Sequence, residues 1–109
     1  MMMYGSRFLH ISFSKPWNVP PKQLEPIFSN AQSWIRYTSN CWIVLTAESC
    51  NAWAERIRNA PGLENANVFV CEFIDYSGFL PDWCWQWMAD HAPHFGIAPT
   101  RPNDGQELS

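Results

Sequence analysis

The sequence contains little charge and no long apolar run, and each shortage excludes a class of protein. Lys, Arg, Asp and Glu make up 16% of the 109 residues, against about a quarter in typical globular domains. The formal net charge of -3 argues against a general affinity for nucleic acid, which needs a basic surface to replace counterions. No apolar stretch approaches the roughly 20 residues that cross a bilayer. We therefore expect no membrane association.

Paired cysteine motifs are also missing. The four cysteines are Cys41, Cys50, Cys71 and Cys84. They form no C-x-x-C pair and no zinc-finger spacing, and no signal peptide is recognisable before them. We expect reduced thiols, buried as small apolar side chains, in a cytoplasmic protein. Two disulfides remain formally possible.

Apolar and aromatic residues are, by contrast, abundant. Hydrophobic residues make up 47% of the chain, and seven residues are Trp. A chain of this length supports one core and should bury roughly two-thirds of its unfolded surface. We expect a single domain over residues 1–91. Residues 92–109 are rich in Pro, Gly and polar residues, which predicts a flexible tail.

Alternation of apolar and polar residues predicts four strands, at residues 7–14, 34–37, 41–46 and 67–74. Thr38, Ser39 and Asn40 are turn-forming residues, so the second and third strands should form a hairpin. A helix is predicted after the first strand and another after the third. The resulting order is β-α-β-β-α-β.

The two helices have recognisable start and stop signals. The first carries an apolar stripe and should be capped by Asn18, with either a kink at Pro26 or a late start. The second should be capped by Ser49 and end at Pro61-Gly62. Both are amphipathic, so each should pack one face on a sheet.

This order is typical of a ferredoxin-like α+β fold, an antiparallel sheet with both helices on one face. Periodicity favours one set of residues facing the helices: Leu9, Ile11, Phe13, Ile35, Tyr37, Ile43, Leu45, Phe69, Cys71 and Phe73. The opposite face then carries His10, Ser12, Trp34, Arg36, Trp42, Val44, Thr46, Val68, Val70 and Glu72. Both faces of the hairpin are apolar, so the pattern does not decide which points inward.

The face without helices is too apolar for a soluble monomer to leave bare. The segment LPDWCWQWMADH, a second copy of the chain, or both together should cover it. A Pro-Asp start favours a helix in this segment over a strand. The predicted buried face is Leu80, Trp83, Cys84, Trp87 and Met88. Trp85 falls off it, so Trp85→Ala should leave folding intact and weaken association, whereas a strand would align all three tryptophans.

His10, Ser12 and Glu72 are the candidate catalytic group, because Ser, His and carboxylate are the ingredients of an activated nucleophile. Residues two apart on a strand lie roughly 6–7 Å apart, which is long for a nucleophile and its base. Polar residues on a partly solvated sheet are the favoured interpretation. His91 and His94 have a chelating spacing, but Pro93 interrupts it. No metal and no cofactor are expected.

Three stretches carry a resemblance to a known family. They are FLHISFSKPWN, WIRYTSNCWIVLT and NVFVCEF, within residues 7–74. The chain resembles the ferredoxin-like family of the small CRISPR adaptation nuclease and its short SinR-like relatives. The resemblance implies a homodimer in which a segment after the fourth strand completes the partner's sheet. Nuclease members hold a divalent metal with an Asp near the end of the first strand, where this chain has Ser12 and Ser14.

We therefore expect a small, non-catalytic, homodimeric binding module, with a protein partner favoured over nucleic acid. The setting would be prokaryotic defence, a toxin–antitoxin pair or a mobile element, including a phage-type inhibitor. The predicted binding residues are Trp34, Arg36, Trp42, Trp83, Trp85 and Trp87. The alternative is an RNA or DNA endonuclease of the resembled family, and a third possibility is a structural subunit of a larger assembly.

Overall fold

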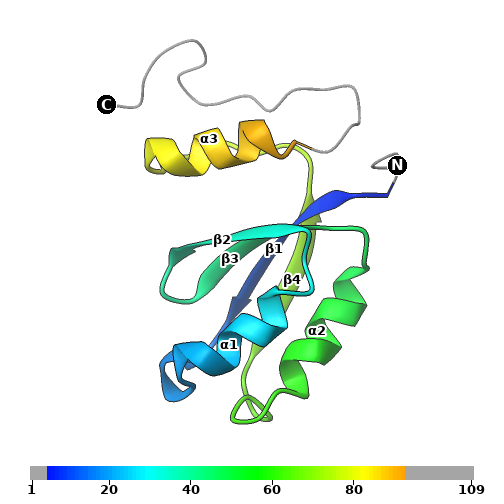
Figure 1. Cartoon of the computed structure of the whole chain (residues 1–109), viewed down its shortest axis with the longest axis vertical. Coiled ribbons are helices and arrows are strands. Elements are labelled where there is room, and N and C mark those ends of the chain that lie inside the picture. The colour runs from blue at the N-terminus through cyan, green and yellow to red at the C-terminus, as the bar shows by residue number, and fades with distance from the viewer. Residues whose placement is uncertain (1–4, 93–109) are drawn as a thin grey trace.

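A four-stranded antiparallel sheet lies between two layers of helix in the computed structural model, which describes residues 5–92 (Figure 1). The strands are β1 (Arg7–Phe13), β2 (Ser33–Thr38), β3 (Cys41–Thr46) and β4 (Val68–Phe73). The helices are α1 (Pro21–Phe28), α2 (Cys50–Arg58) and α3 (Asp82–Asp90), with a short 3-10 turn, η1, at Pro16–Asn18. The predicted α+β class and the order of elements are confirmed. No described helix has the length and hydropathy that a membrane span requires.

The strands lie in the order β2-β3-β1-β4, and every neighbouring pair is antiparallel. The helices α1 and α2 cover one face of the sheet, and α3 lies across the other (Figure 1). Each face therefore has its own apolar core. The predicted tail lies outside the described residues from residue 93 onward, and so does His94.

The start of α1 differs from the prediction. Asn18 belongs to η1, and α1 begins only at Pro21, with Pro20 before it and no side-chain cap. The reason is steric, because a residue that precedes proline is pushed out of the helical region. Val19 and Pro20, which precede Pro20 and Pro21, are both extended, with ψ of 125° and 145°. Pro26 lies inside α1, so the helix does not begin late enough to place Pro26 in its first turn.

The first core lies beneath α1 and α2. Its buried members are Leu9, Ile11, Phe13, Val19, Leu24, Ile27, Phe28, Trp42, Val44, Trp53, Ile57, Ala60 and Leu63. The indole of Trp42 stacks on both Phe13 and Phe28, with its ring centroid 4.7 Å from that of each. Such stacks of large rings account for much of the apolar area that a small domain buries.

The predicted facing of β1 is right, but that of β2, β3 and β4 is reversed. Leu9 lies opposite Val44 and Ile11 opposite Trp42, and directly opposed residues share a face of the sheet. Trp42 and Val44 therefore face α1 and α2. Ile35, Ile43, Leu45 and Phe73 face α3 instead. Because both sets are apolar, only the strand register distinguishes them.

The second core lies between the sheet and α3. Its buried members are Phe8, Ile35, Ile43, Leu45, Cys84, Trp85 and Met88. Tyr37, Phe73, Tyr76, Leu80 and Trp87 pack against it while remaining partly exposed. The expectation that the Trp-rich segment covers the second face is thus met within one chain, over the part of the sheet nearest α3.

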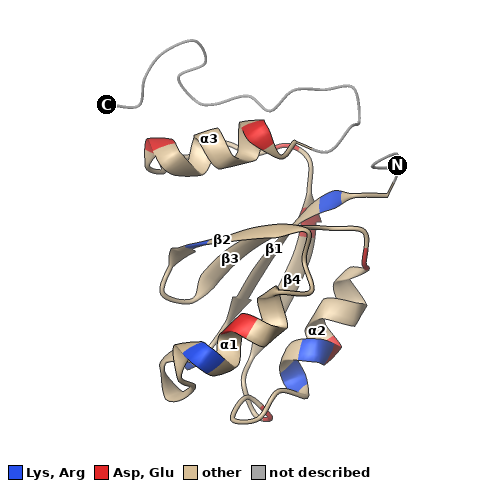
Figure 2. Cartoon of the chain, in the orientation of Figure 1, with Lys and Arg blue, Asp and Glu red and all other residues tan. Residues whose placement is uncertain are grey.

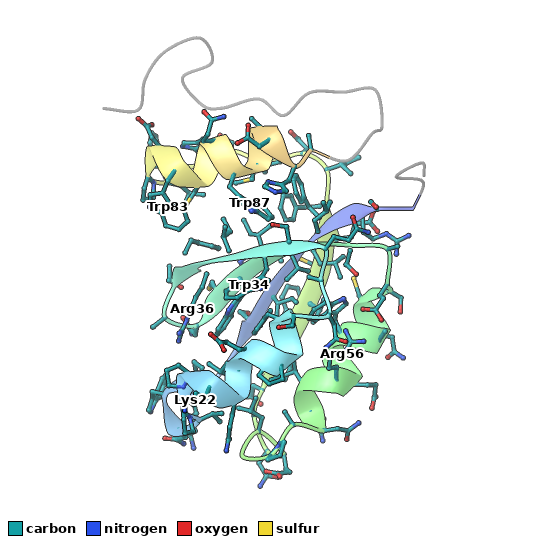
Figure 3. All side chains as sticks on the ribbon, viewed as in Figure 1. Lys22, Trp34, Arg36, Arg56, Trp83 and Trp87 are labelled. Carbon is teal, nitrogen blue, oxygen red and sulfur yellow. The ribbon has the colours of Figure 1, made fainter. Side chains whose placement is uncertain are left out.

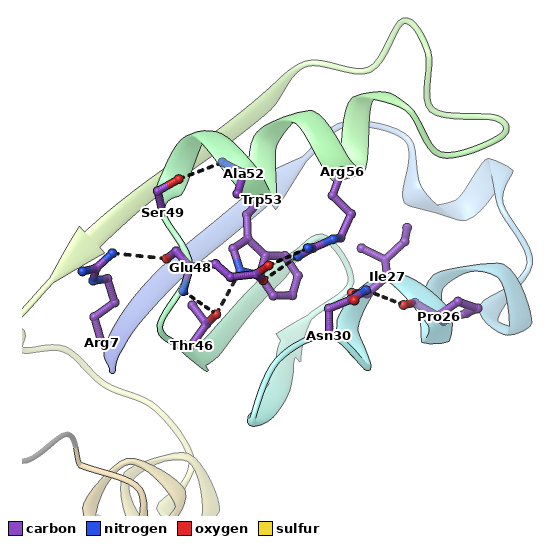
Figure 4. Close-up of polar contacts among 10 residues, drawn as sticks. All are labelled: Arg7, Pro26, Ile27, Asn30, Thr46, Glu48, Ser49, Ala52, Trp53 and Arg56. Atoms are coloured by element: carbon purple, nitrogen blue, oxygen red, sulfur yellow. Dashed lines mark hydrogen bonds and ion pairs between the residues drawn. The ribbon is translucent and has the colours of Figure 1, made fainter. Parts of the chain in front are cut away.

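A polar cluster fixes the connection between β3 and α2 (Figure 4). The hydroxyl of Thr46 accepts hydrogen bonds from the Glu48 backbone N–H and the Trp53 indole N–H. Glu48 accepts two hydrogen bonds from the Arg56 guanidinium, both 2.8 Å long. Ser49 caps α2 as predicted, accepting from the Ala52 N–H at 3.1 Å. These bonds hold α2 against the first core.

Candidate functional site

The segment LPDWCWQWMADH forms the predicted helix, but a different face is buried. Trp85 is 3% exposed and lies in the second core, whereas Trp83 is 52% exposed. Trp87 is half-buried, and its indole N–H donates to the Ser33 hydroxyl at 3.1 Å. Figure 3 shows Trp83 and Trp87 on α3. The prediction that Trp85 lies off the core and Trp83 in it is therefore wrong.

The connection before α3 explains this rotation. Residues 74–81 cross the edge of the second core without regular structure and bring Tyr76 against α3. The Tyr76 ring stacks on Trp85 at 6.3 Å with an interplanar angle of 14°, and it meets Phe73 edge-on at 5.2 Å. Sequence periodicity within α3 contains no information about this loop partner. The sequence signal for such a partner was the presence of Tyr76 and Phe79 in a short connection that also contains Gly78 and Pro81.

A pocket of about 310 Å³ opens between α3, the connection 74–81 and the sheet. Its floor includes His10, Ile43 and Cys71, which lie side by side on β1, β3 and β4. Its walls include Tyr76 and Trp85. The helix α3 therefore covers only part of its sheet face, and the uncovered part is the floor of this pocket.

His10 and Tyr37 are joined by a side-chain hydrogen bond at the floor of the pocket. The His10 Nε2 and the Tyr37 hydroxyl oxygen lie 2.6 Å apart, and the imidazole tautomer sets which one donates. Burial lowers the pKa of His10 from 6.5. Burial, followed by the neighbouring Cys41 thiol, raises the pKa of Tyr37 to about 12. At neutral pH the pair is therefore an uncharged imidazole beside a protonated phenol.

Two buried polar atoms, on residues that line the pocket, have no hydrogen-bond partner within the described part of the chain. They are the Tyr76 hydroxyl and the Trp85 indole N–H, and both are buried. Burial also raises the pKa of Tyr76 to about 12, so its hydroxyl stays protonated. An unpaired buried donor costs about 1–3 kcal/mol relative to a satisfied one. Two residues of the pocket lining thus have unused hydrogen-bonding capacity, on atoms that are buried beside the pocket rather than exposed in it.

The predicted catalytic group is not brought together. His10 and Ser12 share the sheet face that α3 partly covers, but Glu72 lies opposite Leu9 and so points to the other face. There its carboxylate is 3.7 Å from the Arg7 Nε. Nor do the described residues contain any group of three or more His, Cys, Asp or Glu able to hold a metal ion.

The predicted binding residues are dispersed rather than gathered. Trp42 is 1% exposed and belongs to the first core, so its assignment to a binding surface is wrong. Trp34 packs on Phe28 of α1, and Arg36 lies over the Trp42 ring at 4.8 Å (Figure 3). Trp34 and Arg36 therefore lie on the α1 side, away from Trp83.

All four cysteines are free, as predicted. Cys84 is fully buried, while Cys41, Cys50 and Cys71 are half-buried rather than enclosed. Cys71 lines the pocket described above. Its accessibility makes it a natural reporter of that site.

The charged residues are unevenly distributed (Figure 2). Asp82 and Asp90 are the only charged side chains of α3. Lys22 lies on α1, and Arg56 and Arg58 lie on α2, on the opposite side of the sheet. The side of the molecule that bears the pocket is thus acidic.

β4 is an edge strand, and within residues 5–92 no further strand pairs with its outer side. At its start the Ser14 N–H donates to the Asn67 carbonyl at 2.9 Å, so these residues form a hydrogen-bonded pair. Such pairs alternate along an antiparallel ladder, so Phe69 and Cys71 direct their backbone groups at β1. Val68, Val70 and Glu72 direct theirs away from the sheet. The Cys50 thiol contacts the backbone of Glu72. Val68 and Val70 are then the β4 residues whose outward backbone groups have no partner among the described residues.

Compared with protein-family models, curated proteins and solved structures, the chain gives no match. The resemblance to the CRISPR adaptation nuclease family therefore stays a prediction from short motifs. Two features of the chain's own geometry bear on its function: the edge strand β4 and the pocket beside α3.

Proposed function

We propose that the chain is a non-catalytic, homodimeric binding module with a ferredoxin-like fold, and that it acts on a protein partner. The strand order β2-β3-β1-β4, with antiparallel neighbours and with α1 and α2 on one face, supports that fold. Two copies pair along β4, so that two four-stranded sheets join into one. The open backbone of Val68 and Val70 is the observation that carries the proposal.

The two edges of the sheet differ in a way that favours β4 as the joining strand. The β2 edge carries an irregularity between Arg36 and Thr38, and the Arg36 guanidinium donates twice to the Ser39 carbonyl. Bulges and charged residues are the usual devices that prevent strand addition. The ladder of β4 with β1 is regular over six residues, and its sequence VFVCEF has a single charge. It is the unprotected edge.

A two-fold pairing of β4 with itself is geometrically self-consistent. An antiparallel pair centred on Val70 places Val70 opposite Val70 of the second copy and Val68 opposite Glu72, whose backbone would exchange its contact with the Cys50 thiol for the second copy. Phe69 then lies opposite Cys71 of the second copy, on the face that bears the pocket. Phe69 is 63% exposed in one chain, and pairing would cover part of its ring. The contact would therefore combine backbone hydrogen bonds with apolar burial.

Charge favours protein over nucleic acid as the partner of this module. The surface around the pocket and α3 carries Asp75, Asp82 and Asp90, while the basic side chains of α1 and α2 lie on the far side. Phosphate backbones require a basic face. The geometry does not support the nuclease alternative, because His10 and Glu72 lie on opposite faces of the sheet and cannot act on one substrate atom together.

Sedimentation equilibrium of the full chain at micromolar concentration tests the dimer. The expected mass is twice the 12.6 kDa of one chain. Val70→Pro removes an outward N–H without breaking the ladder to β1, and it should give a folded monomer. Phe69→Lys leaves the backbone intact and should weaken the dimer through two like charges near the axis.

Trp83→Lys is the matched control, because Trp83 is a similarly exposed aromatic residue on α3 rather than on β4. It should leave the dimer unchanged. A wild-type chain that sediments as a monomer would end the proposal, as would a dimer that survives both β4 substitutions. Single-stranded RNA or DNA that binds tightly at physiological salt would overturn the assignment of a protein partner.

A further inference from the structure

We propose that the pocket between α3 and the sheet binds a small, uncharged, flat aromatic molecule that presents a hydrogen-bond acceptor such as a ketone oxygen. The inference concerns the pocket rather than the backbone edge of β4, although Cys71 and Phe73 of β4 belong to its lining, and it does not require dimerisation. It rests on the chemistry of the pocket lining, the arrangement of its rings and its unused donors.

The lining indicates that the ligand is uncharged. Twelve residues line the pocket, and most of them are aromatic or aliphatic. They include no Lys, Arg, Asp or Glu, and His10 is neutral because burial lowers its pKa. A charged ligand would lose its hydration there without gaining an ion pair. A neutral ligand avoids that cost.

The walls indicate that the ligand is flat. Tyr76 lies parallel to Trp85, and Phe73 meets Tyr76 edge-on, so the rings form a layered aromatic wall. Offset stacking and edge contacts with such rings favour aromatic ligands over branched aliphatic ones of the same size. The volume of about 310 Å³ lies at the low end of the roughly 300–1,000 Å³ found for ligand pockets. It suits one or two fused rings.

The unpaired donors indicate an acceptor on the ligand. The Trp85 indole is a donor only, and it finds no partner among the described residues. The Tyr76 hydroxyl is equally unpaired. Both atoms are buried, so a ligand oxygen would reach them only after part of the lining moves, and residues 76–80 of that lining have no regular structure. A ketone oxygen would then satisfy a donor that the chain leaves unused.

Prodan, a neutral naphthalene ketone whose emission moves to shorter wavelength in apolar surroundings, is a suitable probe. Titration of the full-length chain should give saturable binding with that shift. Dimethylaminonaphthalene, the same ring system without the ketone, should bind about fivefold to tenfold more weakly, because it lacks one hydrogen bond. Equal affinities for the two compounds would overturn the acceptor part of the proposal.

Two substitutions locate the probe. Trp85→Phe keeps a ring in the wall but removes the donor, so Prodan affinity should fall about fivefold to tenfold and that of dimethylaminonaphthalene should not. Cys71→Phe fills the floor and should reduce binding of both compounds. Trp83→Phe, outside the pocket, is the control. Binding that is unchanged in Cys71→Phe would place the probe elsewhere and overturn the site.

Thiol alkylation provides a second readout that does not depend on fluorescence. Cys71 lines the pocket, whereas Cys50 lies on α2 and serves as an internal reference in the same chain. Prodan should slow alkylation of Cys71, followed by mass spectrometry, and leave that of Cys50 unchanged. Loss of protection in the Val70→Pro monomer would show that the site needs two copies and would overturn its independence. Equal protection of both thiols, or of neither, would overturn the site itself.

Discussion

The indole N–H of Trp53 donates to the hydroxyl of Thr46 at 3.2 Å, and both side chains are almost completely buried. Trp85, in the second core, is buried to a similar degree but has no such partner within the described chain. The two cores thus contain two helix-borne tryptophans that differ in hydrogen bonding. This difference has consequences for stability.

Replacing each of these tryptophans by Phe should affect the free energy of unfolding unequally. Trp53→Phe loses a buried hydrogen bond as well as ring volume, whereas Trp85→Phe removes a donor that was unsatisfied. We expect Trp53→Phe to be more destabilising by about 1–2 kcal/mol, measured by urea denaturation. Equal losses would mean that the Trp53 bond contributes nothing net.

Truncation of α3 tryptophans should reveal which of them belongs to the core. Trp85→Ala should lower the free energy of unfolding by about 3–5 kcal/mol, because it opens a cavity beneath α3. Trp83→Ala, at a half-exposed position, should cost less than about 1 kcal/mol. Thermal melts of both variants check this, and the reverse ranking would restore the facing inferred from helical periodicity.

Stability should fall in mild acid through His10. Its pKa is lowered by burial, so the unfolded chain binds a proton more readily than the folded one does. The contribution of His10 is therefore fully present above its unfolded value of 6.5 and is lost as the pH falls through the lower folded value. His10→Gln, which retains a polar side chain beside Tyr37, should flatten this part of the stability curve. Melting temperatures measured across the range would show it.

The pair of Glu48 and Arg56 should contribute a smaller, separate acid dependence. The Arg56 hydrogen bonds lower the pKa of Glu48, so the stabilisation is present above the ordinary carboxyl value and is lost as pH falls through the folded one. Because the Glu48 side chain is 40% exposed, Glu48→Gln should cost only about 0.5–1 kcal/mol at neutral pH. Addition of salt should reduce that difference, and a difference insensitive to salt would contradict an electrostatic origin.

The order of elements and the helical state of the Trp-rich segment followed from local signals. Ser49 before α2 and Pro81-Asp82 at the start of α3 act within a few residues of themselves, so sequence reveals them. Local signals did not reveal which side chains of the sheet face α1 and α2 and which face α3. The strand β3 is apolar on both sides, and only its pairing with β1 distinguishes Trp42 from Ile43. Long-range register has no signature in a single strand.

The pocket could not be predicted for a related reason. Its unused donors come from α3 and from an irregular connection, and their positions depend on how Tyr76 packs against Trp85. Tyr37 was predicted to face the helices, yet it meets His10 on the other side of the sheet. The candidate group of His10, Ser12 and Glu72 failed at the same step, since one residue of register moves a side chain to the opposite face.

The double-sided burial of β3 also bears on how the sheet avoids misfolding. In most antiparallel sheets a one-residue slip exposes a whole apolar face, and that penalty enforces the pairing. Five of the six residues of β3 are buried, on both faces, so a slipped hairpin would still hide apolar side chains. The turn between β2 and β3 must then favour the native register over a slipped one. The bonds from Arg36 to the Ser39 carbonyl fix the turn geometry and would be lost in any other alignment of the hairpin. The exposed Arg36 guanidinium therefore favours the native register of β2 with β3.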